Sequence, residues 1–315
     1  MPTQKSTIDR SNRSEAPVIP VPARVRHTLA LLDRLSPAAA GAVAERLWFR
    51  RPPVPSPDRR SRRSPRGGEP FSAAWSAGTV TGRVYGSPGA PTAYLVHGWG
   101  GWWQQLGAHV EPLVEAGLCV VAFDAPSHGD SSPGRLGPHF TTLVEFAEAL
   151  AAVVARFGRP TAVIAHSAGA VGVLHARDLG VLPDAYVLVA PPDSMEPMMR
   201  RFSSLLGMGP RAAQRMAERA ERRIGLPLGT FDMVRIAEAL PAHPSLLVVH
   251  DRHDVETPAA GSEALAAAWP GAELLLTEGL GHRRVLWEDA VVERVSGFVA
   301  EAAQGRVRRL SRPAR

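Results

Sequence analysis

The first fifty residues of the chain contain one stretch without hydrophobic periodicity and one stretch with it. Residues 1–22 are polar and proline-containing, which favours a disordered tail. Residues 23–49 carry leucines at intervals of three, and Ser36 followed by Pro37 is typical of a helix start, so we expect two helices. Both helices should pack on the rest of the protein, because an apolar helix face needs a partner. The second helix carries these side chains on one side: Val43, Leu47 and Trp48.

A linker is predicted between these helices and the remainder of the chain. Residues 50–68 read RRPPVPSPDRRSRRSPRGG, a run dominated by proline, arginine and serine. Such a composition is too polar to pack. We therefore expect an N-terminal extension over residues 23–70, made of the two helices and this linker, followed by a main domain over residues 71–305.

Short apolar runs alternate with helix-like stretches from residue 79 onward. Several runs are β-branched and apolar on both faces, as in parallel strands that helices cover on both sides. The alternation predicts an α/β fold with a doubly wound, mostly parallel sheet. The expected strands are residues 79–85, 92–97, 118–123, 161–165, 185–190, 245–250 and 272–277. The expected helices lie near residues 102–116, 140–157, 168–179, 259–269 and 288–303.

One segment interrupts this alternation. Residues 191–243 have helical character, lie between two predicted strands and contain six of the seven methionines. Because the insertion follows the end of a strand, we interpret it as a helical cap over the carboxyl edge of the sheet.

The positive charge is concentrated at the two ends of the chain, which changes the interpretation of the net charge. A formal net charge of +6 would by itself suggest nucleic-acid binding. Residues 1–70 carry +8 and residues 306–315, a basic C-terminal tail, carry +5, so the residues between them carry −7. An acidic central domain argues against nucleic acid as a partner.

The expected compartment follows from the absence of export and membrane signals. No apolar run is long enough to span a membrane, and the first residues lack the apolar stretch of a secretion signal. Cys119 is the single cysteine, which fits a reducing compartment. We therefore expect a cytoplasmic protein without integral membrane association, and the sequence leaves its oligomeric state open.

The most informative motif runs from an apolar strand into a tight turn and a helix, with the sequence VIAHSAGA over residues 163–170. Small residues two positions before and two after Ser167 let the strand and the helix approach closely. The turn would expose the Ser167 hydroxyl near the helix N-terminus, where developing negative charge is favoured. An ordinary turn in which this serine only caps the helix is the alternative.

A glycine-rich turn follows an earlier predicted strand, with the sequence LVHGWGG over residues 95–101. Acyl transfer needs two backbone N–H donors aimed at the tetrahedral oxyanion. Trp99 could supply one donor and Ala168 the other, because the glycines let the backbone turn inward. A turn without a catalytic part is the alternative.

Candidates for an acid and a base follow two later strands. Asp254 lies three residues into its loop, whereas Asp251 at the strand end is better placed to cap a turn, and Asp193 is a third candidate. His282 lies in a glycine-flanked loop that can reach back over the sheet edge. The order Ser167, Asp254, His282 favours a catalytic triad over unrelated loop residues.

These motifs together resemble one known family. The similarity is to the α/β-hydrolase fold family, in its capped serine hydrolase form. HGWG (97–100) resembles the oxyanion loop of that family, and AHSAG (165–169) resembles its nucleophile elbow. FDAPSHGDS (123–131) resembles its Asp-x-Pro-Gly-His-Gly-x-Ser loop. Ala165 replaces the usual first glycine of the elbow, and Ser127 stands where glycine is usual. The resemblance covers residues 75–303 and implies hydrolysis of an ester, thioester or amide without a metal or organic cofactor.

The residues and the resemblance predict a serine hydrolase that cleaves a carboxylic ester or related acyl bond. A thioesterase, acyltransferase or C–C bond hydrolase with the same triad is an alternative, as is a noncatalytic ligand-binding protein of this fold. The expected partner is a small, apolar acyl substrate. The expected pocket residues are Trp99, Trp102, Met195, Met198 and Met199, with Trp103 as a further apolar wall. Methionines that only pack the cap helices together are the alternative.

Overall fold

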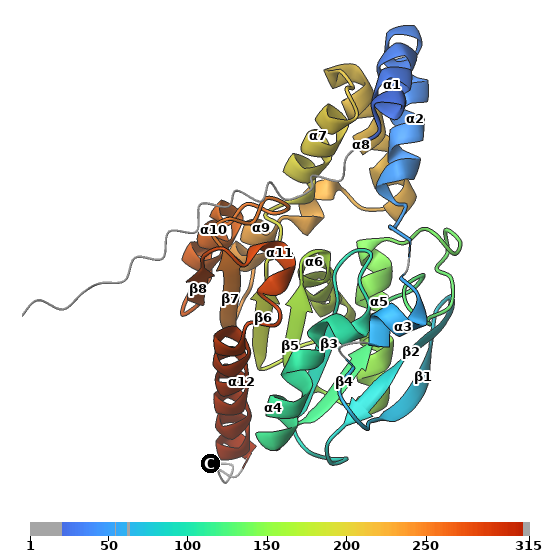
Figure 1. Cartoon of the computed structure of the whole chain (residues 1–315). Coiled ribbons are helices and arrows are strands. Elements are labelled where there is room, and N and C mark those ends of the chain that lie inside the picture. Colours follow the sequence, from blue (N-terminus) through green and yellow to red (C-terminus); the bar gives the residue numbers. More distant parts are fainter. Residues whose placement is uncertain (1–20, 54, 62–63, 311–315) are drawn as a thin grey trace, which may run out of the picture.

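A central β-sheet lies between layers of helices, and a further group of helices stands beyond its carboxyl edge (Figure 1). The computed structural model describes residues 21–53, 55–61 and 64–310. The predicted disordered tail up to residue 20 and the last five residues lie outside the described residues. The α/β fold class expected from the alternating pattern is confirmed.

The sheet has eight strands in the order β1-β2-β4-β3-β5-β6-β7-β8. The first two pairs in this order are antiparallel and the remaining pairs are parallel. All seven predicted strands are present, each within two residues of its expected bounds. The strands are β1 (Glu69–Trp75), β2 (Gly78–Tyr85), β3 (Thr92–Val96), β4 (Cys119–Phe123), β5 (Pro160–His166), β6 (Ala185–Val189), β7 (Ser245–Asp251) and β8 (Glu273–Thr277).

The edge strand β1 is the one that the hydrophobic pattern did not predict. Its sequence, EPFSAAW, contains two apolar aromatic residues, and the residues between them are small. Only Phe71, Ala73 and Trp75 are buried, in alternation with exposed neighbours. Such a short alternation carries little signal, so the strand depends on its antiparallel pairing with β2.

Two hydrophobic cores lie on the two faces of the sheet, because successive side chains of a strand point to opposite faces. In β5, for example, Val163 and Ala165 belong to one core and Ile164 to the other. The first core is covered by α5 (Leu143–Phe157), α6 (Ala168–His175), η2 (Ala176–Leu179) and α10 (Ala260–Ala268). The second is covered by η1 (Trp103–His109), α4 (Val110–Glu115) and α12 (Asp289–Leu310).

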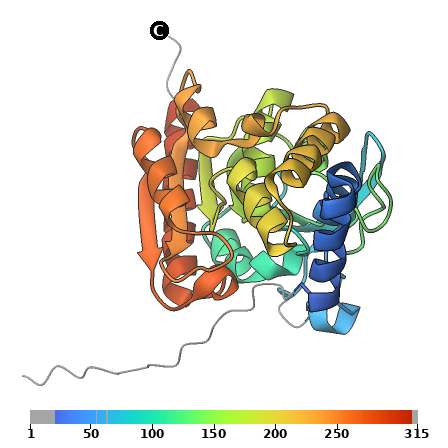
Figure 2. The same ribbon diagram turned by 90° about the horizontal axis from the view of Figure 1, so that it is seen from above.

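The insertion between β6 and β7 is helical, as the sequence predicts. It contains α7 (Met195–Leu205), α8 (Pro210–Ile224), η3 (Leu228–Phe231) and α9 (Met233–Glu238). Two N-terminal helices, α1 (Ala23–Leu35) and α2 (Pro37–Trp48), lie beside α7 and α8 in both views (Figures 1 and 2). The Ser36 side chain caps α2 by accepting from the Ala39 amide at 3.2 Å. The N-terminal helices therefore pack mainly on the cap.

The buried side of α2 differs from the expected one. Val43 is 43% exposed, and α2 contacts α8 through small residues, including Ala40, Gly41 and Ala44. A Cβ added at Gly41 would lie 2.8 Å from the Cβ of Arg215 on α8. The expectation that Val43, Leu47 and Trp48 form the packing face was wrong for Val43, because close approach of the two helices selects short side chains over large ones.

The segment expected to be an unpacked linker is also corrected. Within it, α3 (Pro57–Ser61) is helical and Arg60 is only 5% exposed. The Arg51 amide donates to the carbonyl of His139, and Pro52 lies against Gly100. Hydrogen bonds and close contacts with distant loops therefore hold parts of a segment whose composition alone argues against packing.

The C-terminal boundary shifts as well. Helix α12 continues to Leu310, so the predicted tail that begins at residue 306 starts inside a helix. No helix within the described residues is long and apolar enough to cross a membrane.

Candidate active site

Ser167 lies between β5 and α6, in the turn that the sequence motif predicts. Its φ of 52° is in the left-handed region, which a side chain other than glycine rarely adopts. A Cβ added at Gly169 would lie 2.4 Å from the carbonyl oxygen of His97, and one added at Gly98 would lie 3.0 Å from the Ser167 Cβ. The two glycines therefore let the β3 loop and the β5 turn meet at Ser167.

The structure brings Ser167, His282 and Asp254 into one hydrogen-bonded chain. His282 Nε2 lies 2.9 Å from Ser167 Oγ, and His282 Nδ1 lies 2.7 Å from Asp254 Oδ2. Because Nδ1 faces a carboxylate, it carries the proton, and Nε2 is left to accept from the serine hydroxyl. This is the arrangement in which a histidine can act as a general base on a serine.

Asp254 is held in place by its own loop. Its Oδ1 accepts from the amides of Glu256 and Thr257 at 2.8 and 3.0 Å, and the Thr257 hydroxyl donates to Oδ2 at 2.9 Å. Burial would raise the pKa of Asp254, but hydrogen bonds from His250 and His282 outweigh it and hold the pKa well below its ordinary value. The carboxylate is therefore ionised when it faces the imidazole.

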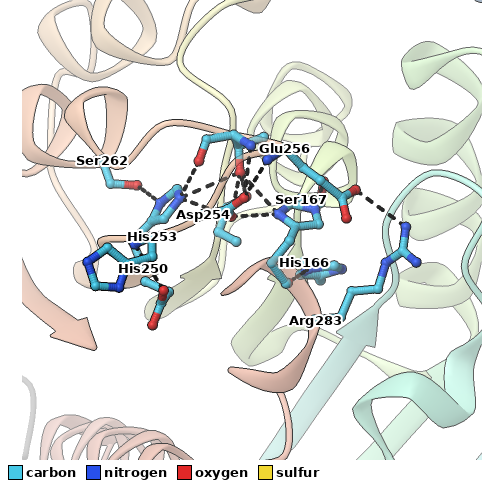
Figure 3. Close-up of polar contacts among 12 residues, drawn as sticks. His166, Ser167, His250, His253, Asp254, Glu256, Ser262 and Arg283 are labelled. Carbon is cyan, nitrogen blue, oxygen red and sulfur yellow. Dashed lines mark hydrogen bonds and ion pairs between the residues drawn. The ribbon is translucent and has the colours of Figure 1, made fainter. Parts of the chain in front are cut away.

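His250 is a part of this cluster that the sequence reading missed. Its Nε2 lies 2.9 Å from the Thr257 carbonyl and 3.3 Å from Asp254 Oδ2, and its Nδ1 lies 2.5 Å from the Ser262 hydroxyl. Figure 3 shows the resulting line of side chains from Ser262 through His250 to Asp254. The only local signal was the spacing of four residues between His250 and Asp254, which says nothing about the fold around them.

The two rejected acid candidates serve other purposes. Asp251 Oδ2 accepts from the Thr277 hydroxyl and the Leu280 amide, both at 2.9 Å, and so braces the loop that carries His282. Asp193 accepts from the amide of Ser194 at 2.7 Å, which is a local turn contact. Of the three candidate acids, Asp254 is the one with a carboxylate within hydrogen-bond distance of the His282 ring.

The expected oxyanion donors lie on the two segments that meet at Ser167. Ala168 is the first residue of α6, where an amide has no partner within the helix. Trp99 lies on the β3 loop directly after Gly98, and its ring stacks on Phe146 with 6.3 Å between centroids. Both amides are thus candidates to bind an oxyanion formed at Ser167.

Two buried histidines hold the loop that follows β3 through hydrogen bonds. His97 Nε2 accepts from the Ala125 amide, and His128 Nε2 accepts from the Gly100 amide, both at 2.9 Å. Their Nδ1 atoms donate to the carbonyls of Gly98 and Pro126. Burial lowers the pKa of His97 to about 4, and burial lowers that of His128 well below its ordinary value, so both rings are neutral.

His166 connects the elbow to the loop of the base. Its Nε2 donates to the carbonyl of His282 at 2.9 Å, and a Cβ added at Gly98 would lie 3.0 Å from its Nδ1. Burial lowers the pKa of His166 well below its ordinary value. The neutral ring therefore packs between the oxyanion loop and the histidine loop.

The expected pocket residues do not all face one cavity. Met195 and Met199 are 5% and 3% exposed and belong to the hydrophobic core, whereas Met198 is partly buried. Trp102 is half-buried, and Trp103 packs in the second core, on the other face of the sheet. Met195 and Met199 belong to the core, and Met198 and Trp99 pack against that same core, so a substrate pocket formed by these residues stays a prediction.

No group of histidine, cysteine, aspartate or glutamate side chains within the described residues is arranged to hold a metal ion. The cluster around Asp254 instead satisfies its polar atoms through hydrogen bonds between its own side chains.

Comparisons with known proteins agree with this fold. A thermophilic esterase from Thermogutta terrifontis is 17% identical, with 75% of this chain and 99% of that chain covered and a TM-score of 0.55. A monoacylglycerol lipase from Paleococcus ferrophilus is 19% identical, with 71% and 99% covered and a TM-score of 0.53. A CIB-like hydrolase from Thermoplasma acidophilum is 16% identical, with 75% and 99% covered and a TM-score of 0.55.

At such identities these similarities show the fold alone, and none of the curated proteins compared with the sequence matches it. The sequence does match the model of the alpha/beta hydrolase family over residues 93–296, which is more than half of the chain. The protein is therefore a hydrolase that belongs to the alpha/beta hydrolase family.

Proposed function

We propose that this hydrolase cleaves a carboxylic ester through a covalent acyl-enzyme on Ser167, with His282 as the base and Asp254 as the orienting acid. The observation that carries the proposal is the continuous chain of contacts from Ser167 Oγ through His282 to Asp254, at 2.9 and 2.7 Å. Separations of this size allow direct proton transfer without a bridging water.

In the first half of the reaction, Ser167 Oγ attacks the ester carbonyl carbon while its proton moves to His282 Nε2. The carbonyl oxygen becomes an oxyanion that the Trp99 and Ala168 amides can bind. Asp254 stabilises the imidazolium, because its carboxylate is ionised and fixed by Thr257. His282 then returns the proton to the departing alkoxide, and the C–O bond to the alcohol breaks.

In the second half, a water molecule takes the place of the alcohol. His282 Nε2 accepts a proton from the water as its oxygen attacks the acyl carbon, and the same amides bind the second oxyanion. Collapse of this intermediate breaks the bond to Ser167 Oγ, which regains its proton from His282. The carboxylic acid leaves and the free enzyme is restored.

The nucleophile assignment is tested by labelling and by mutation. A fluorophosphonate probe should label the wild-type protein at Ser167. The variant Ser167→Ala should not be labelled, and its kcat for an ester should fall on the order of 10⁶-fold. Ser204→Ala, at an exposed serine of the cap, is the matched control and should label normally. Full labelling of Ser167→Ala in a pure sample would contradict the proposal.

The substrate class is proposed to be a small apolar acyl ester. Trp99 lies next to the oxyanion position, and each methylene buried against such a surface contributes about 0.8 kcal/mol. We expect kcat/KM for p-nitrophenyl esters to rise roughly threefold to fourfold per added CH₂ until the site is full. A flat profile from two to twelve carbons would exclude an apolar acyl site, and faster cleavage of matched acyl thioesters would favour the thioesterase alternative.

A further inference from the structure

A cleft with a volume of about 740 Å³ lies away from the proposed triad, where α3 adjoins β1, β2 and η1. None of the residues of the proposed triad lines it. Among the described residues that line it, the charged ones are Arg60, Arg83 and Asp130, which together carry an excess of one positive charge. Its volume lies within the range of small-molecule sites.

Arg60 is unusual because it is buried without enough partners. Its side chain is 6% exposed, and its Nη2 donates to Asp130 Oδ1 at 2.6 Å. Its Nε and Nη1 are buried and have no hydrogen-bond partner within the described residues. A guanidinium has five N–H bonds, of which three belong to Nε and Nη1. Leaving such donors unsatisfied in a buried position is costly, so they indicate a site for an acceptor.

The protein charges near Arg60 are already engaged. The Asp130 side chain is 66% exposed, so water competes for its carboxylate. Asp124 is buried, and its two oxygens accept from the amides of Trp103 and Asp130 at 2.8 and 3.0 Å. Arg83 adds a second cation, held by the carbonyls of Gly67 and Gly68. An oxyanion in the cleft would therefore meet two guanidinium groups and the single, solvent-exposed carboxylate of Asp130.

Gln104 of η1 adds the opposite chemistry to the lining of the same cleft. Its Oε1 is buried and has no hydrogen-bond partner within the described chain. An amide oxygen accepts, so a fitting ligand must also donate. This requirement distinguishes the expected ligand from a simple anion.

We propose that the cleft binds a small hydroxylated oxyanion, whose carboxylate or phosphate oxygens accept from Arg60 and whose hydroxyl donates to Gln104 Oε1. The site is separate from the proposed triad and does not depend on the reaction assigned to it. Charge-assisted hydrogen bonds to Arg60 supply most of the affinity, and the bond to Gln104 selects for the hydroxyl.

The first test uses the full wild-type chain and measures the melting temperature and binding heat with defined probes. Glycerol 3-phosphate and glycerate each carry an oxyanion and a hydroxyl, and they separate the phosphate from the carboxylate source. Sulfate, which has no hydroxyl at neutral pH, and glycerol, which has no charge, each carry only half of the required chemistry. Saturable binding of at least one complete probe, tighter than that of either half, supports the proposal. If neither complete probe binds at millimolar concentration, the proposal is wrong.

The second test locates the binding. Arg60→Gln should weaken binding of the complete probe by about tenfold or more, whereas Arg59→Gln, at the exposed neighbouring arginine of α3, should leave it unchanged. Gln104→Leu should reduce the preference for the hydroxylated probe over sulfate. Each melting temperature is compared with that of the same variant without ligand, which separates binding from folding. Equal affinities of Arg60→Gln and Arg59→Gln would overturn the proposal.

Discussion

Ser127 shows how one residue can depart from a family pattern without disrupting the loop. It stands where the resembling family usually has glycine, and its φ of 64° is in the region that favours glycine. The Ser127 hydroxyl donates to the Phe140 carbonyl at 2.7 Å and accepts from the Gly134 amide at 2.8 Å. These bonds to a neighbouring loop offset the backbone strain that the serine side chain introduces.

His250 is the residue whose substitution gives the sharpest test of how Asp254 is positioned. His250→Phe removes a donor to Asp254 while keeping a planar ring, so the pKa of Asp254 should rise toward its ordinary value. We expect kcat to fall about tenfold, well short of the roughly 10⁴-fold expected for Asp254→Asn, and the acid limb of the kcat/KM profile to move to higher pH.

The control for this prediction is Ser262→Ala, which removes only the hydroxyl behind His250. It should change kcat less than His250→Phe, because Nε2 of His250 can still donate to Asp254. A correctly folded His250→Phe protein with a wild-type pH profile would show that His250 has only a packing role.

At the scale of elements, the contact between α2 and α8 decides how the N-terminal helices attach. Gly41 lies against the backbone of α8, where a Cβ would be 2.9 Å from the amide nitrogen of Met216. Glu45, 1% exposed, forms an ion pair with Arg223 of α8 beside it. A buried carboxylate needs such a partner, so the two contacts make this pair of helices specific.

Gly41→Leu should therefore lower the free energy of unfolding by about 1–3 kcal/mol, the usual cost of forcing a larger side chain into a packed contact. Urea denaturation measures the change. Ala38→Leu, on the exposed side of the same helix, is the matched control and should be nearly neutral. Equal stability of the two variants would show that α2 does not pack on α8 as described.

At the scale of the whole molecule, buried histidines make stability depend on pH. Burial lowers the pKa values of His97 and His109 to about 4, below the value of 6.5 expected in the unfolded chain. Between these values the unfolded state binds more protons than the folded state, so stability rises with pH and is lost as pH falls. Asp124 acts in the opposite direction, because burial raises its pKa to about 6.

Because there are two such histidines and one such aspartate, the effect of the histidines on the free energy of unfolding is the larger one. Between pH 7.5 and pH 5, each of the two histidines should cost on the order of 2 kcal/mol of stability and Asp124 should return about 1 kcal/mol. We expect the urea midpoint to fall clearly over this range. His97→Gln, which cannot gain a proton, should show a smaller fall, and an unchanged midpoint in the wild-type protein would contradict the neutral, buried state of these rings.

Local pattern was enough to predict seven of the eight strands, the helices between them along the chain, and Ser167, Asp254 and His282 as candidate site residues. The inner parallel strands are short apolar runs because both of their faces are buried, and that requirement is visible in the sequence itself. The candidates could be found because each follows a predicted strand, and the ends of parallel strands meet at one edge. The three candidates can therefore be recognised although they are far apart in the sequence.

The tertiary structure decided everything that depends on contacts between distant segments. The weakly patterned β1 is a strand because β2 pairs with it, and α2 buries its small residues because α8 approaches it closely. Arg60 lies in a segment of ordinary linker composition, yet Asp130, seventy positions later, holds it in a cleft. Burial and hydrogen-bond partners depend on which residues surround a side chain in the folded protein. When those residues come from distant parts of the chain, no local hydrophobic pattern in the sequence reveals them.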